Sequence, residues 1–242
     1  MDRINRLLKT LSAIKWNMAF LIKYCCNAAF RNAIANNKSL KNICSGKTCI
    51  IVGNGPSLLN MDLTNISDFF VFTVNDIGKN QSLFKTLHSS CHVIVDPFFC
   101  ELKEDDLRKF LRAISCDNKK RICICSDTLI GNPVLKEFST IDFFFVYIHN
   151  NWDSLLRKRI DFQWNLYQTN NVVQAAIYAA IYMGFSEIKL IGCEMTSMYE
   201  HLEVNANNVI NNYHSYEYTQ EEKDRLKHWS TIFDNEAILK EY

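Results

Sequence analysis

Residues 48–58 read TCIIVGNGPSL, an apolar, β-branched run that breaks into two glycines and a proline. A continuous run of this kind is typical of a strand that is buried on both faces of a parallel sheet. The 242-residue chain holds only seven glycines and three prolines, so their concentration here indicates a turn with a specific requirement. Because they lack a Cβ, Gly53 and Gly55 would let a phosphate or a ribose approach the main chain.

Similar apolar runs recur along the chain, and polar residues end most of them. We predict further strands over residues 69–76, 92–96, 121–126, 141–149 and 187–192. Asn54, Asn75 and Asp96 come at or just after the carboxyl ends of the first three strands. Because an open parallel sheet binds ligands beyond those ends, these side chains predict a ligand site.

The segment before the last strand gives the clearest sign of a parallel α/β fold. An alanine-rich helix over about residues 171–183, a stop at Gly184 and a strand follow one another directly. Apolar residues at helical spacing over 100–114 predict another covering helix. We therefore expect the α/β class: a three-layer, Rossmann-like, mostly parallel sheet with a helical N-terminal extension.

The N-terminal segment differs in charge from the rest of the chain. Residues 1–47 hold nine Lys or Arg and one acidic residue, whereas the remainder holds 18 Lys or Arg and 25 acidic residues. We separate a basic helical extension, 1–46, from a nucleotide-binding catalytic domain, 47–242. A basic arm on an acidic body predicts contact with an anionic surface. The apolar run that follows Lys15 is shorter than the ~20 residues of a membrane span, so a helix docked on its own domain and a peripheral membrane anchor both remain open.

The ten cysteines are scattered through apolar runs, and no CxxC pair occurs among them. This spacing argues against zinc and against a secreted disulfide scaffold. We expect reduced, mostly buried thiols in a cytoplasmic protein, located at the inner face of the membrane if the basic extension anchors it.

Two familiar phosphate-binding loops are excluded by the sequence of the glycine turn. A GxGxxG motif would need glycine where Leu58 stands, and a Walker A loop would need Gly-Lys-Ser or Gly-Lys-Thr. Pro56 fits the first turn of a following helix, and Ser57 would help to satisfy the free N–H groups of that helix.

The combination of GNGPSL (53–58) with MGFSEIKLIGCE (183–194) resembles two related groups of bacterial proteins. These are the glycosyltransferase family 42 sialyltransferases and the broader MptE-like (6-hydroxymethylpterin pyrophosphokinase-like) domain family, and the resemblance covers roughly residues 47–218. It departs from the sialyltransferases at Asp96, where they have Asn, and at 170–172, where they have Thr-Ser-Gly. The resemblance implies a nucleotide site formed by Gly53, Asn54, Gly55, Pro56, Ser57, Asn75, Asp96 and Asn171.

The sialyltransferase resemblance implies a glycosyltransferase of surface-polysaccharide synthesis (O-antigen, capsule or lipooligosaccharide). It would transfer sialic acid or a related sugar from a CMP-activated donor to a glycan or glycolipid hydroxyl, with inversion and without a cofactor or metal. We expect His214 to act as the base, with His201 as the second candidate, because histidine titrates near neutrality. Tyr199 and Tyr213 are candidates to donate hydrogen bonds to the departing phosphate.

Two alternatives remain open. An MptE-like pyrophosphokinase would use Mg-ATP, with Mg²⁺ held by Asp76 and Asp96 and with Glu194 as a further candidate ligand. An inactive family member would instead bind a partner or assist assembly, in keeping with a last helix that stops early enough to suggest a truncated C-terminus. Nucleic acid is not an expected partner under any of these interpretations.

Overall fold

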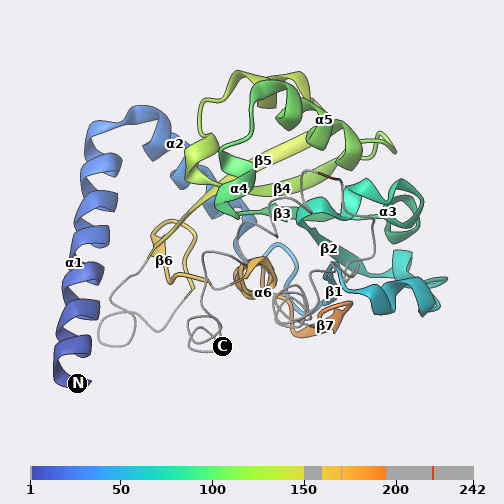
Figure 1. Cartoon of the computed structure of the whole chain (residues 1–242), viewed down its shortest axis with the longest axis horizontal. Helices are drawn as coiled ribbons and strands as arrows, with labels where there is room; N and C mark the ends of the chain where they lie inside the picture. Colours follow the sequence, from blue (N-terminus) through green and yellow to red (C-terminus); the bar gives the residue numbers. More distant parts are fainter. Residues whose placement is uncertain (1, 150–159, 170, 195–219, 221–242) are drawn as a thin grey trace.

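The computed structural model describes residues 2–149, 160–169, 171–194 and 220. Its centre is a seven-stranded sheet in the order β6-β5-β4-β3-β2-β1-β7, and every neighbouring pair is parallel (Figure 1). The predicted α/β class is confirmed, and the sheet is parallel throughout. The strands are β1 (Thr48–Val52), β2 (Phe70–Val74), β3 (Cys91–Ile94), β4 (Arg121–Ser126), β5 (Ile141–Ile148), β6 (Asn165–Leu166) and β7 (Glu187–Ile191).

Helices lie on both faces of this sheet and at one end of it. The α-helices are α1 (Asp2–Cys26), α2 (Ala28–Asn36), α3 (Gln81–Leu87), α4 (Pro97–Cys100), α5 (Glu104–Ile114) and α6 (Val172–Tyr182). Short 3₁₀ turns connect them: η1 (Asn37–Leu40), η2 (Pro56–Asn60), η3 (Ile66–Asp68), η4 (Asn75–Lys79), η5 (Asp127–Leu129) and η6 (Pro133–Glu137). The predicted helix over 100–114 is found as α5, which begins only at Glu104, and Cys100 instead ends the short helix α4 that Pro97 starts.

Alternating side chains of the strands build a core on each face of the sheet. On one face Ile51, Phe72 and Val93 pack with the alanines of α6. On the other face Val52 and Val71 pack with apolar residues of α3 and α5. Successive side chains point to opposite faces of a strand, so an unbroken apolar run such as TCIIV fills both cores at once.

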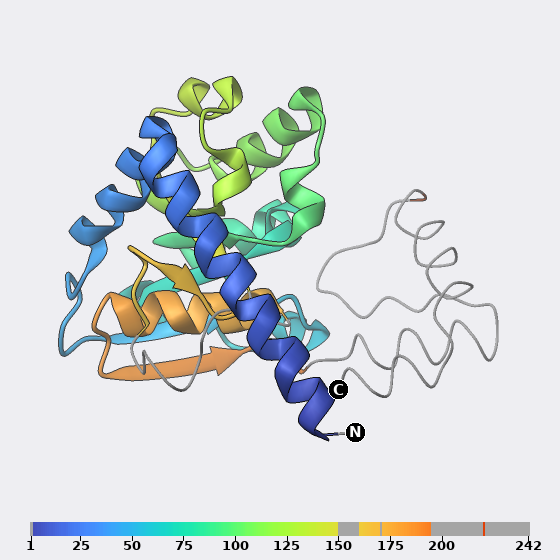
Figure 2. The same ribbon diagram turned by 90° about the vertical axis from the view of Figure 1, so that its left-hand side faces the viewer.

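The N-terminal segment packs against the carboxyl end of β5. Phe20 of α1 and Phe30 of α2 meet the Tyr147 ring edge to face, at centroid distances of 5.5 and 5.8 Å. The buried Asn37 side chain donates from Nδ2 to the carbonyl oxygens of Phe145 and Phe162, both at 2.7 Å. Figure 2 shows α1 running across the outside of the molecule. The extension is therefore docked on the domain through its inner face.

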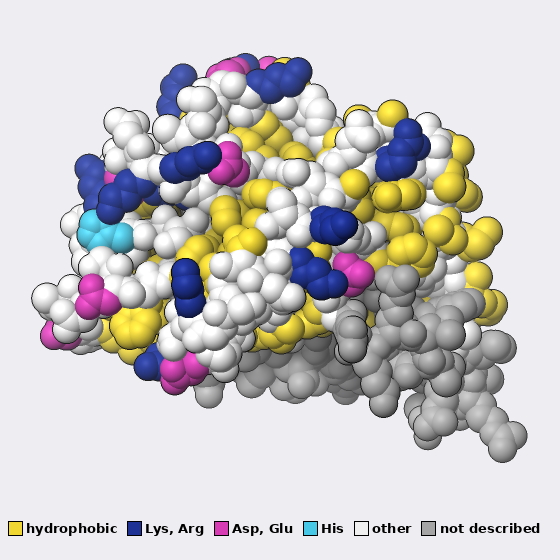
Figure 3. Space-filling model, turned by 180° about the vertical axis from the view of Figure 1, so that it is seen from behind, with side chains coloured by type: hydrophobic (Ala, Val, Ile, Leu, Met, Phe, Trp, Pro, Cys, Tyr) yellow, Lys and Arg dark blue, Asp and Glu magenta, His cyan; other side chains and the backbone are white. Residues whose placement is uncertain are grey.

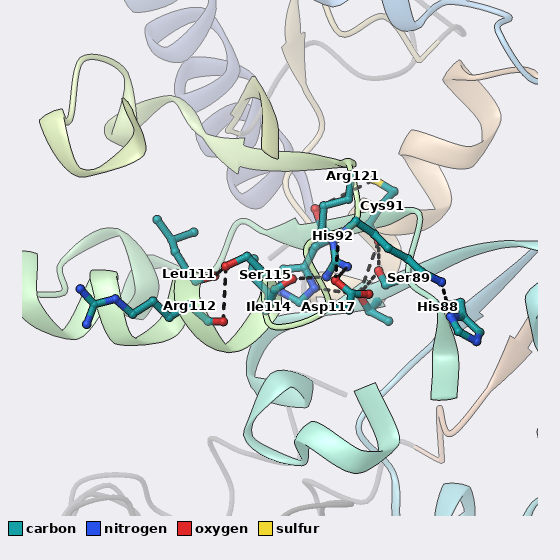
Figure 4. Close-up of polar contacts among 12 residues, drawn as sticks. His88, Ser89, Cys91, His92, Leu111, Arg112, Ile114, Ser115, Asp117 and Arg121 are labelled. Carbon is teal, nitrogen blue, oxygen red and sulfur yellow. Dashed lines mark hydrogen bonds and ion pairs between the residues drawn. The ribbon is translucent and has the colours of Figure 1, made fainter. Parts of the chain in front are cut away.

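A buried polar cluster lies on the α5 side of the sheet, among apolar side chains (Figure 4). Thr73 Oγ1 lies 2.8 Å from His92 Nδ1 and 2.6 Å from Ser89 Oγ. The guanidinium of Arg121 is fully buried, pairs with Asp117 and donates to the carbonyl oxygen of Ile114. Burial and the positive charge of Arg121 lower the pKa of His92 to about 3. These groups hold the start of β4 against α5.

None of the helices in the described part of the chain is long and apolar enough to cross a membrane. The described cysteines are free thiols, and five of the nine are buried.

Candidate functional site

The polar residues that follow the strands share one edge of the sheet. Because all the strands are parallel, their carboxyl ends meet there. The structure therefore brings the predicted Gly53–Ser57 turn, Asn75 and Asp96 to the same edge. Three further groups stand there, which the sequence prediction did not assign to the nucleotide site: Asp127 after β4, His149 after β5 and Glu194 after β7.

The glycine turn lies at the point where the order of the strands reverses. From β1 the chain moves outward strand by strand to β6, and it then returns to place β7 on the other side of β1. In open parallel sheets, ligands bind at such a topological switch point. The turn after β1, Gly53 to Ser57, is thus in the position that this rule favours.

The two glycines of the turn allow two loops to pack closely together. Gly55 N donates to the carbonyl oxygen of Gly192 at 2.8 Å. A Cβ on Gly53 would collide with that same oxygen, and a Cβ on Gly55 would overlap the Glu194 carboxylate. The expected reason for these glycines was ligand access, whereas in the structure the loop after β7 fills the space that they leave.

Glu194 also takes over the capping role expected of Ser57. Its Oε1 accepts a hydrogen bond from Ser57 N at 3.1 Å, and no side chain caps η2 at Gly55. A carboxylate is favourable at this position because the free N–H groups at the start of a helical turn attract negative charge. A ligand phosphate at the start of η2 would have to displace Glu194 or be repelled by it.

Asn54 and Asn75 each place a buried acceptor at the edge without a partner. Their Oδ1 atoms are inaccessible and accept no hydrogen bond from the described residues. Val52 pairs with Thr73 in the register of β1 with β2, so the two asparagines follow at the same offset on adjacent strands. Leaving a buried acceptor unpaired costs about 1–3 kcal/mol. Asn75 also has a left-handed backbone, with φ of 44°, a conformation that asparagine adopts more readily than most residues.

Asp96 and Asn171 both act as helix caps. Asp96 Oδ1 accepts from Phe98 N at 2.9 Å at the start of α4, and Asn171 Oδ1 accepts from Gln174 N at 3.0 Å at the start of α6. Gly46 N donates to Gly184 O near the beginning of β1, so α6 ends at the amino edge of the sheet and begins at the carboxyl edge. The capped N-terminus of α6 therefore lies on the same side as the asparagines.

A second group forms where α1 crosses the ends of β4 and β5. The Trp16 ring stacks on His149, with centroids 4.0 Å apart. Lys23 Nζ lies 2.6 Å from Asp127 Oδ2, and the Asp127 side chain is 2% exposed. Burial is the main cause that lowers the pKa of His149; the Lys23 charge lowers it further, and the Asp127 charge opposes both. His149 is therefore neutral near pH 7 and able to accept a proton.

The sequence contained one sign of His149, namely a polar residue directly after an apolar strand, as at Asn75. The expected catalytic residues His214, Tyr199 and Tyr213, the second candidate His201 and the predicted last helix lie outside the described residues, apart from Gln220. Within the described residues no group of three or more His, Cys, Asp or Glu side chains is arranged to hold a metal ion.

The fold and the edge define a parallel α/β protein with a candidate ligand site at its topological switch point. Residues 27–199 match the family described as "6-hydroxymethylpterin diphosphokinase MptE-like". The match covers well over half of the chain, so the chain belongs to the MptE-like family. The MptE-like part of the expected resemblance is confirmed, and no match supports the family 42 sialyltransferase part. No curated protein matches the chain.

Proposed function

We propose that this protein is a transferase that binds a nucleoside triphosphate at the carboxyl edge of its sheet and transfers a diphosphoryl group to an alcohol. The single observation that supports nucleotide binding is the pair of unpartnered acceptors, Asn54 Oδ1 and Asn75 Oδ1, at the carboxyl ends of the neighbouring strands β1 and β2. Membership of a family named for a diphosphokinase supports the type of transfer.

The ligand group that fits these acceptors is a hydrogen-bond donor. A phosphate oxygen only accepts, whereas the two neighbouring hydroxyls of a ribose donate. Adjacent strands lie about 4.8 Å apart, so one ribose can span the ends of β1 and β2. We therefore assign Asn54 and Asn75 to the ribose rather than to the phosphates.

The phosphates are then directed away from η2, where the Glu194 carboxylate already accepts from Ser57 N. On the opposite face of the sheet from η2 lies α6, an eleven-residue helix that packs against β1, β2 and β3 and begins at this edge. A helix N-terminus carries a partial positive charge that favours phosphate. The triphosphate accordingly runs from Asn75 toward Asp96.

The residues along that path fit Mg²⁺. Carboxylate and amide oxygens are the ligands that this ion prefers, and a nucleotide-bound Mg²⁺ needs only one or two protein carboxylates besides the phosphates. Asp96 and Asp76 would hold it, and Mg²⁺ would then take the place of Lys79, whose Nζ pairs with Asp76 Oδ2 at 2.9 Å. Bound there, Mg²⁺ would supply neutralisation of the charge that develops on the phosphates.

His149 is our candidate for the proton acceptor. In diphosphoryl transfer the alcohol oxygen bonds to the β-phosphorus of ATP, the bond from that phosphorus to the α-phosphate oxygen breaks, and AMP leaves. The hydroxyl proton has to be accepted by a base, and the lowered pKa keeps the His149 imidazole neutral for that role.

Transfer of a sugar from a CMP-activated donor is the second candidate, because the same two acceptors would hold the ribose of a cytidine nucleotide. Thermal-shift measurements with ATP, CMP and CDP, each with and without Mg²⁺, separate the two reactions. We expect stabilisation by Mg-ATP, and ³¹P NMR should detect AMP when 6-hydroxymethylpterin is added as the alcohol. Stabilisation by CMP alone, without any response to Mg-ATP, would overturn diphosphoryl transfer in favour of sugar transfer.

A further inference from the structure

The outward face of α1 carries a row of exposed apolar side chains between Leu8 and Ile22. Leu8, Leu11, Met18 and Ile22 are each more than half exposed, and their spacing of three, four and seven residues places them in one stripe. Ile14 and Leu21, 38% and 40% exposed, widen that stripe. A surface helix normally turns charged and polar residues to this side, so an uncovered stripe of this size indicates a docking surface.

The orientation of α1 is fixed by its opposite face. Phe20 is 1% exposed and packs among Phe30, Tyr147 and Trp164. Asn17 Oδ1 accepts from Trp164 Nε1 at 3.2 Å, and Lys23 pairs with Asp127. With these contacts on the inner side, the apolar stripe cannot turn inward to find a core.

The charged residues of the N-terminal segment that accompany the stripe are positive, apart from Asp2 at the start of α1. Lys15 is exposed between Leu11 and Met18 on the same side of the helix, and no acidic residue occurs from residue 3 to residue 61. Lys38 and Lys41 are also exposed just beyond α2. Figure 3, seen from behind, shows apolar side chains gathered along the edge where α1 lies, with Lys or Arg side chains near them.

We propose that the outer face of α1 docks onto the surface of a bilayer that contains anionic phospholipid. The apolar stripe would enter the boundary between headgroups and acyl chains, and the lysines would meet the negative headgroups. The helix lies on the bilayer and does not cross it, in line with the lack of a spanning helix among the described residues. A second copy fits less well, because a symmetric pair of α1 faces would bring two basic surfaces together.

The test is flotation of the full-length protein with vesicles of phosphatidylcholine, with and without phosphatidylglycerol. The expected result is co-flotation with the anionic vesicles only, weakened by salt. The double variant Met18→Gln/Ile22→Gln should reduce binding at least tenfold, and Lys15→Gln should reduce it less. The matched control is Leu59→Gln/Met61→Gln, which changes two exposed apolar residues in and after η2 and should bind like the wild type.

Near-ultraviolet circular dichroism of each variant reports whether the aromatic contacts of α1 are intact. Vesicle flotation is compared only between the wild type and variants that keep these contacts. Flotation that is absent, or equal for the wild type and the Met18/Ile22 variant, overturns the proposal. Sedimentation that shows a dimer lost in the same variant would assign the stripe to a second copy instead. None of these readouts uses nucleotide binding, so the membrane proposal and the proposed function can fail separately.

Discussion

The indole ring of Trp16 lies flat on the imidazole of His149, with an angle of 4° between the ring planes. This contact joins the N-terminal helix to the end of β5, at the edge where the candidate site lies. The helix covers His149 and sets how much water reaches it, so the basicity of the proposed proton acceptor depends on a residue more than a hundred positions away in the chain.

Replacing Trp16 by alanine should raise the pKa of His149 toward its ordinary value of ~6.5, because burial is the main cause of the lowered pKa. A titration of the histidine signals followed by NMR measures the change. Ile14→Ala, on the outer face of the same helix, is the control and should leave the pKa as it is. An unchanged pKa in Trp16→Ala would show that the stacked ring does not control the histidine.

Replacing Lys23 by methionine should lower the free energy of unfolding by about 1–3 kcal/mol, since it leaves the buried Asp127 carboxylate without its cation. Urea denaturation measures the loss. The double variant Lys23→Met/Asp127→Asn removes the charge as well and should recover most of the stability. If the double variant is as unstable as the single one, the loss comes from packing of the lysine stem and not from the ion pair.

His92 should make the protein less stable as the solution becomes acidic. Its pKa is about 3 in the folded state and ~6.5 when the chain is unfolded, so below pH 6.5 the unfolded chain binds a proton that the folded protein excludes. The free energy of unfolding should therefore fall as pH drops from 6.5 toward 3, by up to about 1.4 kcal/mol per pH unit from this group.

The check on His92 is a pair of urea-denaturation series from pH 7 to pH 4, for the wild type and for His92→Gln. Carboxylates titrate equally in both proteins, so the difference between the two slopes belongs to the histidine. The variant should start less stable and lose stability more slowly. Parallel slopes would mean that His92 is protonated equally in the two states.

Gly55→Ala should lower the free energy of unfolding of the ligand-free protein by about 1–3 kcal/mol. The new methyl group would meet the Glu194 carboxylate and lie 2.8 Å from Gly192 O. Thermal unfolding of the ligand-free variant measures this. Gly131→Ala is an informative control: a Cβ meets nothing there, but φ is 83°, so it reports the cost of backbone strain alone. The contrary result is a Gly55→Ala protein that is as stable as the wild type but does not bind nucleotide. It would mean that position 55 is glycine to give a ligand access and not to let the loop after β7 pack closely.

The sequence was a good guide wherever a local pattern determined the structure. Unbroken apolar runs predicted six strands to within two residues at each end, and the position of Asn75 at the end of such a run predicted its place at the carboxyl edge of the sheet. The two-residue β6 was missed because pairing with Tyr147 and Ile148, and not its own pattern, makes Asn165 and Leu166 a strand. Contacts between distant segments could not be predicted either: Trp16 with His149, and Glu194 with the turn at Ser57.

The glycine turn shows the same limit more sharply. Its composition was sufficient to predict a close approach at Gly53 and Gly55, but not which group approaches. That group is the loop after β7, whose position depends on the return of the chain across the sheet to lie beside β1. A strand order of this kind is a property of the whole fold, and no short stretch of sequence contains it.

The central claim is that Asn54 and Asn75 bind the ribose of a nucleotide, and Asn75→Gly tests it most directly. Glycine adopts the left-handed backbone of this position without strain, so the variant removes the amide and leaves the turn in place. Isothermal titration calorimetry with Mg-ATP should show binding to the wild type and at least about tenfold weaker binding to the variant, the effect of one hydrogen bond of about 1.4 kcal/mol. Equal affinity in the two proteins, or no binding of Mg-ATP to the wild type, would contradict the account.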